Sequence, residues 1–199
     1  MNHYLCFIDT ETTSVKPWAT SLVQVAFIIY DMTNKKFVAK YNSHVRPFEG
    51  DPEPEPKALE VNGLLLEDLQ TFTDPIDVQT GLTNLWGKYV DKFDTKQKMH
   101  FVAYNAPFDY DVLQAWWKKC NEATGQTKNY LGSYFWKQPI DVMILANDFL
   151  KEERYGMQNF KQLTVAKQLD IEFNEEDLHD ALADIKLMIK IYKKIGGFG

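Results

Sequence analysis

The segment YLCFIDTETT, residues 4–13, decides the fold. Its first five residues are apolar, and such a run predicts a strand that is covered on both faces. Asp9 and Glu11 follow, and because side chains two residues apart on a strand point the same way, we expect their carboxylates to converge. Two like charges at the edge of a core repel each other and lose hydration unless a cation or a shared proton offsets the cost. The segment therefore predicts an active site, and a divalent metal is its simplest stabiliser.

Length and composition predict a single domain over residues 1–199, since the chain is 45% apolar and has no long polar tract. No apolar run approaches the roughly 20 residues that cross a bilayer, so we expect no contact with a membrane. We expect no signal peptide, because no basic segment followed by an apolar run is seen before Tyr4. Cys6 and Cys120 cannot build a disulfide framework, and we expect both to be reduced thiols in a cytoplasmic protein.

The charge balance limits the partners. The chain has 28 acidic and 22 basic residues, and Arg46 and Arg154 are its arginines. This composition argues against a dedicated reader of duplex nucleic acid, which needs a broad basic surface. It leaves a nucleic-acid enzyme open, because bound metals add positive charge locally and a short single-stranded end presents few phosphates.

Short apolar runs predict three further strands. They cover Leu22–Tyr30, Lys36–Val45 and His100–Tyr104. Apolar spacing predicts several helices. They cover Lys57–Glu60, Leu66–Leu69, Val78–Lys92, 108–120, 141–151, 159–169 and 178–194. With a loop at Asp51–Pro56 and a short strand before Asp141, this order predicts an α/β fold in which helices flank a mixed sheet.

The last predicted helix carries a further carboxylate, Asp184. The core stripe of that helix is expected to comprise Leu178, Leu182, Ile185, Ile189 and Tyr192. The neighbours of Asp184 on its own face are Ala181, Leu187, Met188 and Ile191, so we expect partial burial. An ionised carboxylate that is buried alone costs several kcal/mol, and Asp184 should therefore have a partner. The alternative to a metal is an ion pair with Lys186 or Lys190, or an exposed helix edge.

Another candidate position lies in FVAYNAPFDYDVL, residues 101–113, where a predicted strand leads into a helix. Asn105 suits a helix cap, and Pro107 suits the first turn. Asp109 and Asp111 both lie near the start of the helix, where the helix dipole favours negative charge. Capping alone explains either residue, and the spacing does not choose between them.

His179 is the histidine that falls beside a candidate metal ligand. On an ideal helix, five positions put it about 140° away from Asp184, so we place it on the segment that leads into the helix. An imidazole there accepts a proton near neutral pH and suits a general base better than a fixed ligand.

Three motifs, FIDTETT, YNAPFDYDVL and HDALAD, resemble in their order and spacing those of the DEDDh exonucleases, also called the DnaQ-like family. The resemblance covers nearly the whole chain and implies a ribonuclease H-like fold with a mixed five-stranded sheet flanked by helices. The residues that match the family's catalytic set are Asp9, Glu11, Asp109, His179 and Asp184. The family pattern thus selects Asp109 over Asp111. Position 180 is Asp, where tyrosine-type relatives carry Tyr, so the histidine type is indicated.

The resemblance implies release of nucleotides from a 3′ end at a site with two divalent ions, Mg²⁺ or Mn²⁺. It implies that Asp9 bridges both ions and that Glu11 and Asp184 bind the one that carries the nucleophile. Asp109 would support the other ion. His179 would take the proton from the attacking water.

The resemblance also suggests residues that contact the substrate. The backbone at Thr12 and Thr13 would lie against the terminal nucleotide, and Asn105 belongs to the same motif as Asp109. Trp18 and Phe108 are the aromatic residues best placed to stack on bases. Ordinary packing is the alternative for both.

Two positions depart from the family pattern. Ser14 stands where the family often has Gly, and Tyr104 stands where it often has His. Neither position supplies a metal ligand, so both bear on the shape of the substrate pocket.

Several functions remain compatible with these residues. We favour a 3′-to-5′ exonuclease that acts on single-stranded or frayed DNA ends, because the run DTETT looks more like proofreading members than like oligoribonucleases. A 3′-to-5′ exoribonuclease is the alternative within the family, since no motif reads a 2′ hydroxyl. An alternative of another class is a non-catalytic module that holds nucleic-acid ends or docks on a polymerase, and a proofreading role would itself require a polymerase as partner.

Overall fold

The computed structural model describes residues 3–16, 19–173 and 180–198. Its centre is a five-stranded sheet in the order β3-β2-β1-β4-β5. The strands are β1 (Tyr4–Thr12), β2 (Leu22–Asp31), β3 (Lys36–His44), β4 (His100–Ala103) and β5 (Ile140–Asp141). β1, β2 and β3 pair antiparallel, whereas β4 and β5 continue the sheet in parallel. The predicted mixed five-stranded sheet is confirmed.

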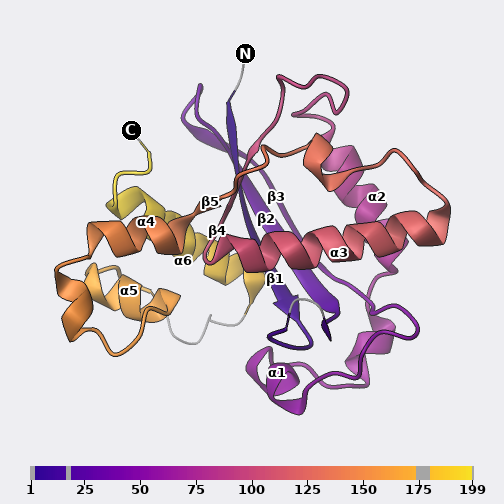
Figure 1. Ribbon diagram of the computed structural model, residues 1–199, viewed down its shortest axis with the longest axis horizontal. Coiled ribbons are helices and arrows are strands. Elements are labelled where there is room, and N and C mark those ends of the chain that lie inside the picture. The colour runs from indigo at the N-terminus through magenta and orange to yellow at the C-terminus, as the bar shows by residue number, and fades with distance from the viewer. Residues whose placement is uncertain (1–2, 17–18, 174–179, 199) are drawn as a thin grey trace.

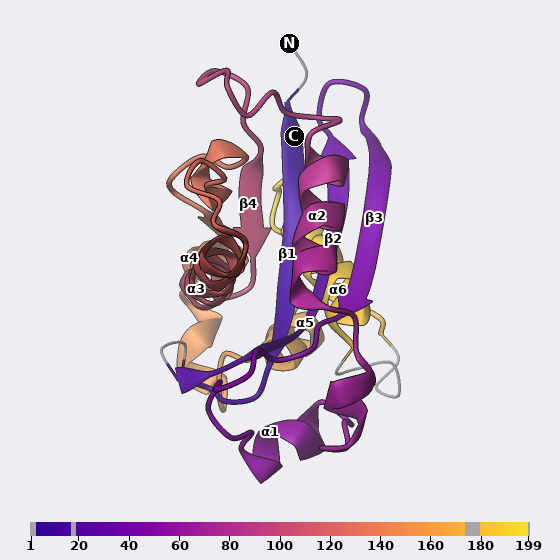
Figure 2. The ribbon, with the colours of Figure 1, turned by 90° about the vertical axis from the view of Figure 1, so that its right-hand side faces the viewer.

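Helices cover both faces of the sheet. The helices over the faces are α2 (Pro75–Trp86), α3 (Ala106–Thr124), α4 (Val142–Phe149), α5 (Gln162–Gln168) and α6 (Ala181–Lys194), and short 3₁₀ turns lie at Asp68–Thr71, Leu131–Ser133 and Glu153–Gly156. α1 (Pro56–Val61) buries no residue and lies beyond the end of the sheet (Figure 2). Figure 2 shows α2 in front of the sheet and α6 behind it. α3 shares the layer of α2, and α4 and α5 pack beside α6, so the sheet is sandwiched between two helical layers (Figure 1).

β1 runs through the middle of the sheet and is buried on both faces. Leu5 and Phe7 pack into the layer of α6, whereas Cys6 and Ile8 pack into the layer of α2 and α3. The strand does not end at the last apolar residue but continues to Thr12, because its pairing with β2 continues. The alternation of sides therefore continues through the polar part of the strand.

α2 differs from its predicted range of Val78–Lys92. The helix begins at Pro75, because Asp74 accepts a hydrogen bond from the backbone of Ile76 at its start, and it ends at Trp86, with Gly87 as its cap. Tyr89 therefore lies beyond the helix, and its hydroxyl donates to the backbone of β3. The apolar spacing continued past the glycine and made the predicted helix too long.

The core stripe predicted for the last helix is narrower than the face that α6 buries. Ile185 and Tyr192 are buried, but Leu182 and Ile189 are only half-buried, and Leu178 lies outside the described residues. The other buried residues of α6 are Ala181, Leu187, Met188 and Ile191. α6 crosses β1 and β2 and contacts α4 and α5 as well, so it buries a wider face than a single stripe. The face that carries Asp184 is therefore turned toward the protein.

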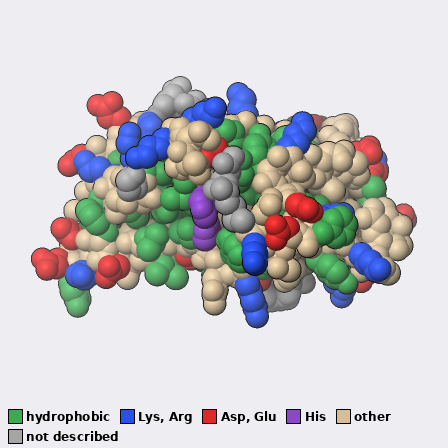
Figure 3. Space-filling view, turned by 90° about the horizontal axis from the view of Figure 1, so that it is seen from above, with side chains coloured by type: hydrophobic (Ala, Val, Ile, Leu, Met, Phe, Trp, Pro, Cys, Tyr) green, Lys and Arg blue, Asp and Glu red, His purple; other side chains and the backbone are tan. Residues whose placement is uncertain are grey.

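Three further features concern the cysteines, the length of the helices and the charges on the surface. Cys6 and Cys120 are both buried and unpaired. Among the described residues, no helix combines the length and the apolar character that a bilayer crossing requires. Figure 3 looks onto the end of the molecule at which β1 begins, and there basic and acidic side chains are interspersed around hydrophobic ones.

Candidate active site at the end of the central strand

Three carboxylates meet where β1 ends and α6 begins. Asp9 and Glu11 follow Leu5 and Phe7 in the alternation of β1, so they point toward the layer of α6. Asp184 lies in the first turn of α6. Each of the three residues offers a carboxylate oxygen that lies within 4.8 Å of the other two. All three side chains are half-buried, which is the arrangement of a group that could hold a cation.

Asp109 approaches the same end of β1 from the opposite layer. Thr10 points away from Asp9 and Glu11, and both its backbone N–H and its hydroxyl donate to Oδ1 of Asp109, at 3.0 and 2.8 Å. Asp109 is buried in the first turn of α3, whereas Asp111 is exposed. Asp109 is not part of the three-carboxylate group, but its charge acts on Asp9. The structure thus sets Asp109 beside the group and leaves Asp111 in solvent.

Burial and the charges of neighbouring carboxylates raise the pKa values of Asp9, Glu11 and Asp109. Burial, followed by the charges of Asp109, Glu11 and Asp184, raises the pKa of Asp9 well above its ordinary value. Burial and the charge of Asp184 raise the pKa of Glu11 to about 8. Burial raises the pKa of Asp109 to about 7, although the two hydrogen bonds from Thr10 lower it. Each carboxylate therefore resists losing its proton while its neighbours are charged.

This donor set fits a divalent metal. The group consists of hard carboxylate oxygens, which are the ligands that Mg²⁺ and Mn²⁺ prefer. A cation among them would offset both the mutual repulsion and the loss of hydration. The residues present therefore fit the divalent metal that the sequence predicts.

A fifth carboxylate, which the sequence analysis did not single out, supports the start of α3. Asp141 is buried at the end of β5, and its Oδ1 accepts from the backbone N–H of Asn105 at 3.2 Å and of Met143 at 2.9 Å. Asn105 is exposed, has a left-handed backbone (φ 67°) and makes no capping hydrogen bond with its side chain. Asn105 therefore occupies the N-cap position of α3 as predicted, but its side chain does not cap the helix, and Asp141 holds its backbone instead.

The turn after β1 is held by the segment around α1. The carbonyl of Thr12 accepts from Nδ2 of Asn62 at 3.1 Å, and the carbonyl of Thr13 accepts from the backbone N–H of Glu55 at 2.9 Å. The side chains of Thr12 and Thr13 are themselves buried. The backbone proposed to face a terminal nucleotide is thus fixed by residues far along the chain.

The two departures from the family pattern both make hydrogen bonds. The hydroxyl of Ser14 donates to Oε1 of Glu55 at 2.7 Å, which ties the turn after β1 to the loop before α1. The hydroxyl of Tyr104 donates to the carbonyl of Phe160 at 2.8 Å, which ties the end of β4 to the segment before α5. Both residues therefore join segments that are far apart in the sequence.

The other predicted site residues are placed as follows. Phe108 is half-buried and packs against the core that α2 and α3 share. His179 and Trp18 lie outside the described residues.

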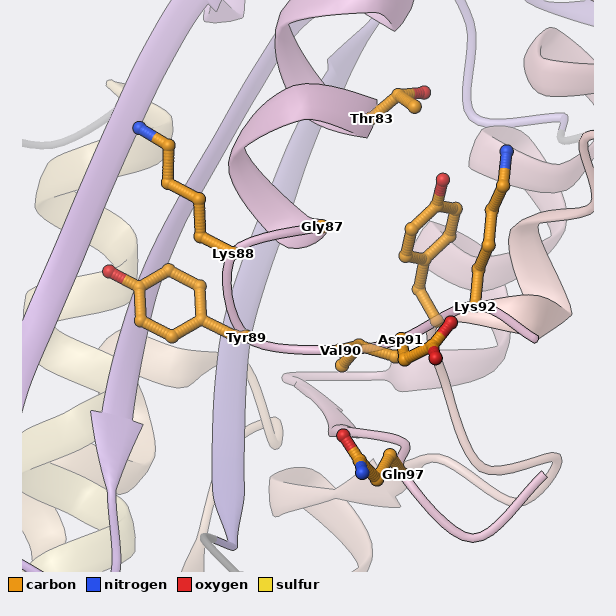
Figure 4. A pocket seen from close by; sticks show the side chains of 9 residues that line it. Thr83, Gly87, Lys88, Tyr89, Val90, Asp91, Lys92 and Gln97 are labelled. Carbon is orange, nitrogen blue, oxygen red and sulfur yellow. The ribbon is translucent and has the colours of Figure 1, made fainter. Parts of the chain in front are cut away.

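A pocket at the other end of the sheet does not contain these groups. It is a cavity of about 430 Å³ lined by the segment after α2, including Lys88, Asp91 and Lys92 (Figure 4). This segment precedes His100, which pairs with Leu5 at the start of β1. The pairing of β1 with β4 runs from Leu5 to Phe7, and Asp9 and Glu11 lie beyond Phe7. The pocket and the candidate active site are therefore separate.

Comparison with solved structures relates the fold to known nucleases. The chain is similar to E. coli exonuclease I in complex with a dT13 oligonucleotide, with a TM-score of 0.72 and 19% identity over 96% of this chain. It is similar to the zinc-bound form of the E. coli exonuclease I–single-stranded DNA complex, with a TM-score of 0.74 and 19% identity over 99% of this chain. The chain covers 40% and 41% of those two proteins. A full-length 3′-exonuclease gives a TM-score of 0.68 and 15% identity over 96% of this chain and 80% of its own.

Comparison by sequence gives a more specific result. None of the curated proteins matches the chain. The family model described as "Exonuclease" (RNase_T) matches residues 6–192, a range that includes all five residues of the predicted catalytic set. The fold, the match and the carboxylate group agree, and the chain therefore belongs to the DEDDh, or DnaQ-like, 3′-to-5′ exonuclease family of the ribonuclease H-like superfamily.

Proposed function

We propose that the protein is a metal-dependent exonuclease that hydrolyses single-stranded or frayed DNA from the 3′ end and releases nucleoside monophosphates. The observation that carries this proposal is the meeting of Asp9, Glu11 and Asp184 within 4.8 Å, with Asp109 beside them. Such a group has little value for stability on its own, because burial and like charge both work against it.

The four carboxylates would hold two divalent cations, Mg²⁺ or Mn²⁺. When bound, such ions polarise the scissile phosphate and promote ionisation of the attacking water. Asp9, Glu11 and Asp184 lie on the α6 side of β1, whereas Asp109 approaches the same end of the strand from the α3 side, where Thr10 holds it. The carboxylates would thus align a phosphodiester at the end of β1, with the backbone of Thr12 and Thr13 facing the terminal nucleotide. In this proposal Asn105, Phe108 and Trp18 border the path of the strand.

His179 is the proposed general base, since it precedes the helix that carries Asp184. The variant His179→Ala is expected to lower kcat by about 10²- to 10⁴-fold, because positioned proton transfer contributes that much. It should leave the thermal stabilisation by Mg²⁺ unchanged, because the four carboxylates remain. The pH dependence of kcat and a melting curve with added Mg²⁺ measure the two effects. A variant that keeps wild-type kcat and the wild-type pH profile would show that another group takes the proton, and His3→Ala, at an exposed position, is the control.

DNA is the proposed substrate, and support comes from the similar fold of E. coli exonuclease I, which is described in complex with dT13 and dA16 oligonucleotides. The test compares matched single-stranded DNA and RNA oligomers, labelled at the 3′ or the 5′ end, with Mg²⁺, Mn²⁺ or chelator. We expect immediate release of 3′-labelled mononucleotide, stepwise shortening of the 5′-labelled strand, faster turnover of DNA and no reaction in chelator.

The other outcomes of this experiment each select an alternative. Faster turnover of RNA would make the protein an exoribonuclease. No shortening of either strand would favour a module that binds nucleic-acid ends or docks on a polymerase. Since we expect the isolated chain to be active, a polymerase would be an additional partner and not a requirement.

A further inference from the structure

A buried glutamine joins the sheet to the helix that carries Asp184. Gln24 is only 4% exposed, and it pairs directly with Glu11 in the register of β1 and β2. Its Nε2 donates to Oδ1 of Asn42 on β3 at 2.9 Å and to Oδ2 of Asp180 at 3.3 Å. Both amide hydrogens are therefore used, and one of them reaches α6.

Asp180 is the residue at which α6 begins. Its Oδ1 accepts from the backbone N–H groups of Leu182 and Ala183, at 2.8 and 3.2 Å. Capping of this kind needs one oxygen only. The second oxygen is directed to Gln24, so a single carboxylate connects the first turn of the helix to the strand beside Glu11.

We infer that Gln24 and Asp180 are positioning residues for the proposed exonuclease reaction. Asp180 is covalently bonded to His179 and lies one helical turn before Asp184. Gln24 is also the residue of β2 that pairs with Glu11 in the sheet. Its hydrogen bond to Asp180 therefore fixes the start of α6 relative to Glu11. The pair therefore sets the distance between the carboxylates of β1 and Asp184. This inference rests on the proposed function.

The chemistry of the pair suits this role. An amide buried without hydrogen bonds costs free energy, so an apolar residue would be the simpler choice at a buried strand position. A lysine or arginine at position 24 would hold Asp180 more strongly, but its charge would compete with a divalent cation for the nearby carboxylates. A neutral donor holds Asp180 and leaves that charge balance unaltered.

The test uses Gln24→Met, which keeps the side-chain length and removes the donor. Its matched control is Gln79→Met, because Gln79 is also buried and donates to the carbonyl of Trp117 and to Oδ1 of Asn121, away from the carboxylates. We expect both variants to melt at lower temperature. Only Gln24→Met should lower kcat, by about 10- to 100-fold, since small displacements of reacting groups cost up to that much, while KM changes little. An equal loss of kcat in both variants, or in neither, would overturn the inference.

The variant Asp180→Ser separates capping from positioning. Serine still caps the helix, but its one oxygen cannot also reach Gln24. We expect Asp180→Ser to lose kcat as Gln24→Met does, and the double variant to be no worse than either single variant, because both break the same link. Wild-type kcat in Asp180→Ser would reduce its role to capping.

Binding of Mg²⁺ provides a readout that does not depend on activity. In the Gln24→Met variant, the Mg²⁺ concentration that gives half of the thermal stabilisation should rise several-fold, whereas in Gln79→Met it should equal that of the wild type. If the wild type degrades no nucleic acid, the proposed function fails, and this titration still decides whether the pair positions Asp184. An unchanged Mg²⁺ midpoint in Gln24→Met would contradict the inference.

Discussion

Asp9→Asn and Asp109→Asn are each expected to lower kcat by at least about 10³-fold, which corresponds to a loss of roughly 4 kcal/mol of transition-state stabilisation. Asn keeps the shape of the side chain but removes the negative charge that holds a cation. In wild type, Thr10 fixes Asp109 through two hydrogen bonds, and the charge of Asp109 acts on Asp9. The measurement is single-turnover release of 3′-terminal mononucleotide in saturating Mg²⁺.

Asp111→Asn is the matched control for this experiment. Asp111 lies two residues after Asp109 on the same helix but is exposed, so its substitution tests the loss of a charge from α3 without changing the carboxylate group. We expect its kcat to stay within about twofold of wild type, as surface substitutions have small effects. Retention of more than a tenth of the activity by Asp109→Asn, or an equal loss in Asp111→Asn, would remove Asp109 from the site.

Glu11→Gln is expected to stabilise the metal-free protein at alkaline pH. The pKa of Glu11 is about 8 in the folded protein against an ordinary value of 4.5, so folding takes up a proton between these limits. The contribution of Glu11 to stability is complete below about pH 4.5 and is lost as pH rises through 8. At pH 9 in chelator, the variant should therefore be more stable than wild type by on the order of 1 to 2 kcal/mol after screening by solvent.

Saturating Mg²⁺ should reverse this order, because the cation binds the charged form of Glu11 and stabilises only the folded state. Chemical denaturation of both proteins at pH 5, 7 and 9, with chelator or Mg²⁺, measures the difference in free energy of unfolding. Glu60→Gln, at an exposed position, is the control and should track the wild type throughout. A difference between Glu11→Gln and wild type that is independent of pH in chelator would mean that Glu11 is not held among like charges.

The features that sequence reasoning predicted well are those with a local cause. The apolar run before Asp9 forced a covered strand, and the two-residue period of that strand brought Asp9 and Glu11 to one side. The partial burial of Asp184 followed from the composition of its helix face. The choice of Asp109 required the family motif, because helix capping explained Asp111 equally well.

The features that were missed depend on contacts between distant parts of the chain. Thr10 and Asp109 are 99 residues apart, and Gln24 and Asp180 are 156 residues apart. The spacing of residues within one strand or helix therefore cannot predict either contact. A signal for Gln24 was present, since it is the polar amide in the otherwise apolar run LVQVAFIIY. A buried polar residue in such a strand needs a partner, but the sequence does not say which one.

The distance along the chain between Asp9 and Asp184 has a consequence for folding. The three-carboxylate group forms only when α6 docks on β1, and contacts of such high sequence separation are costly in chain entropy to close. No fragment that lacks either end of this span contains the group. In refolding, recovery of nuclease activity would therefore report completion of the whole sheet and its last helix, and intermediates with native secondary structure alone would leave nucleic acid intact.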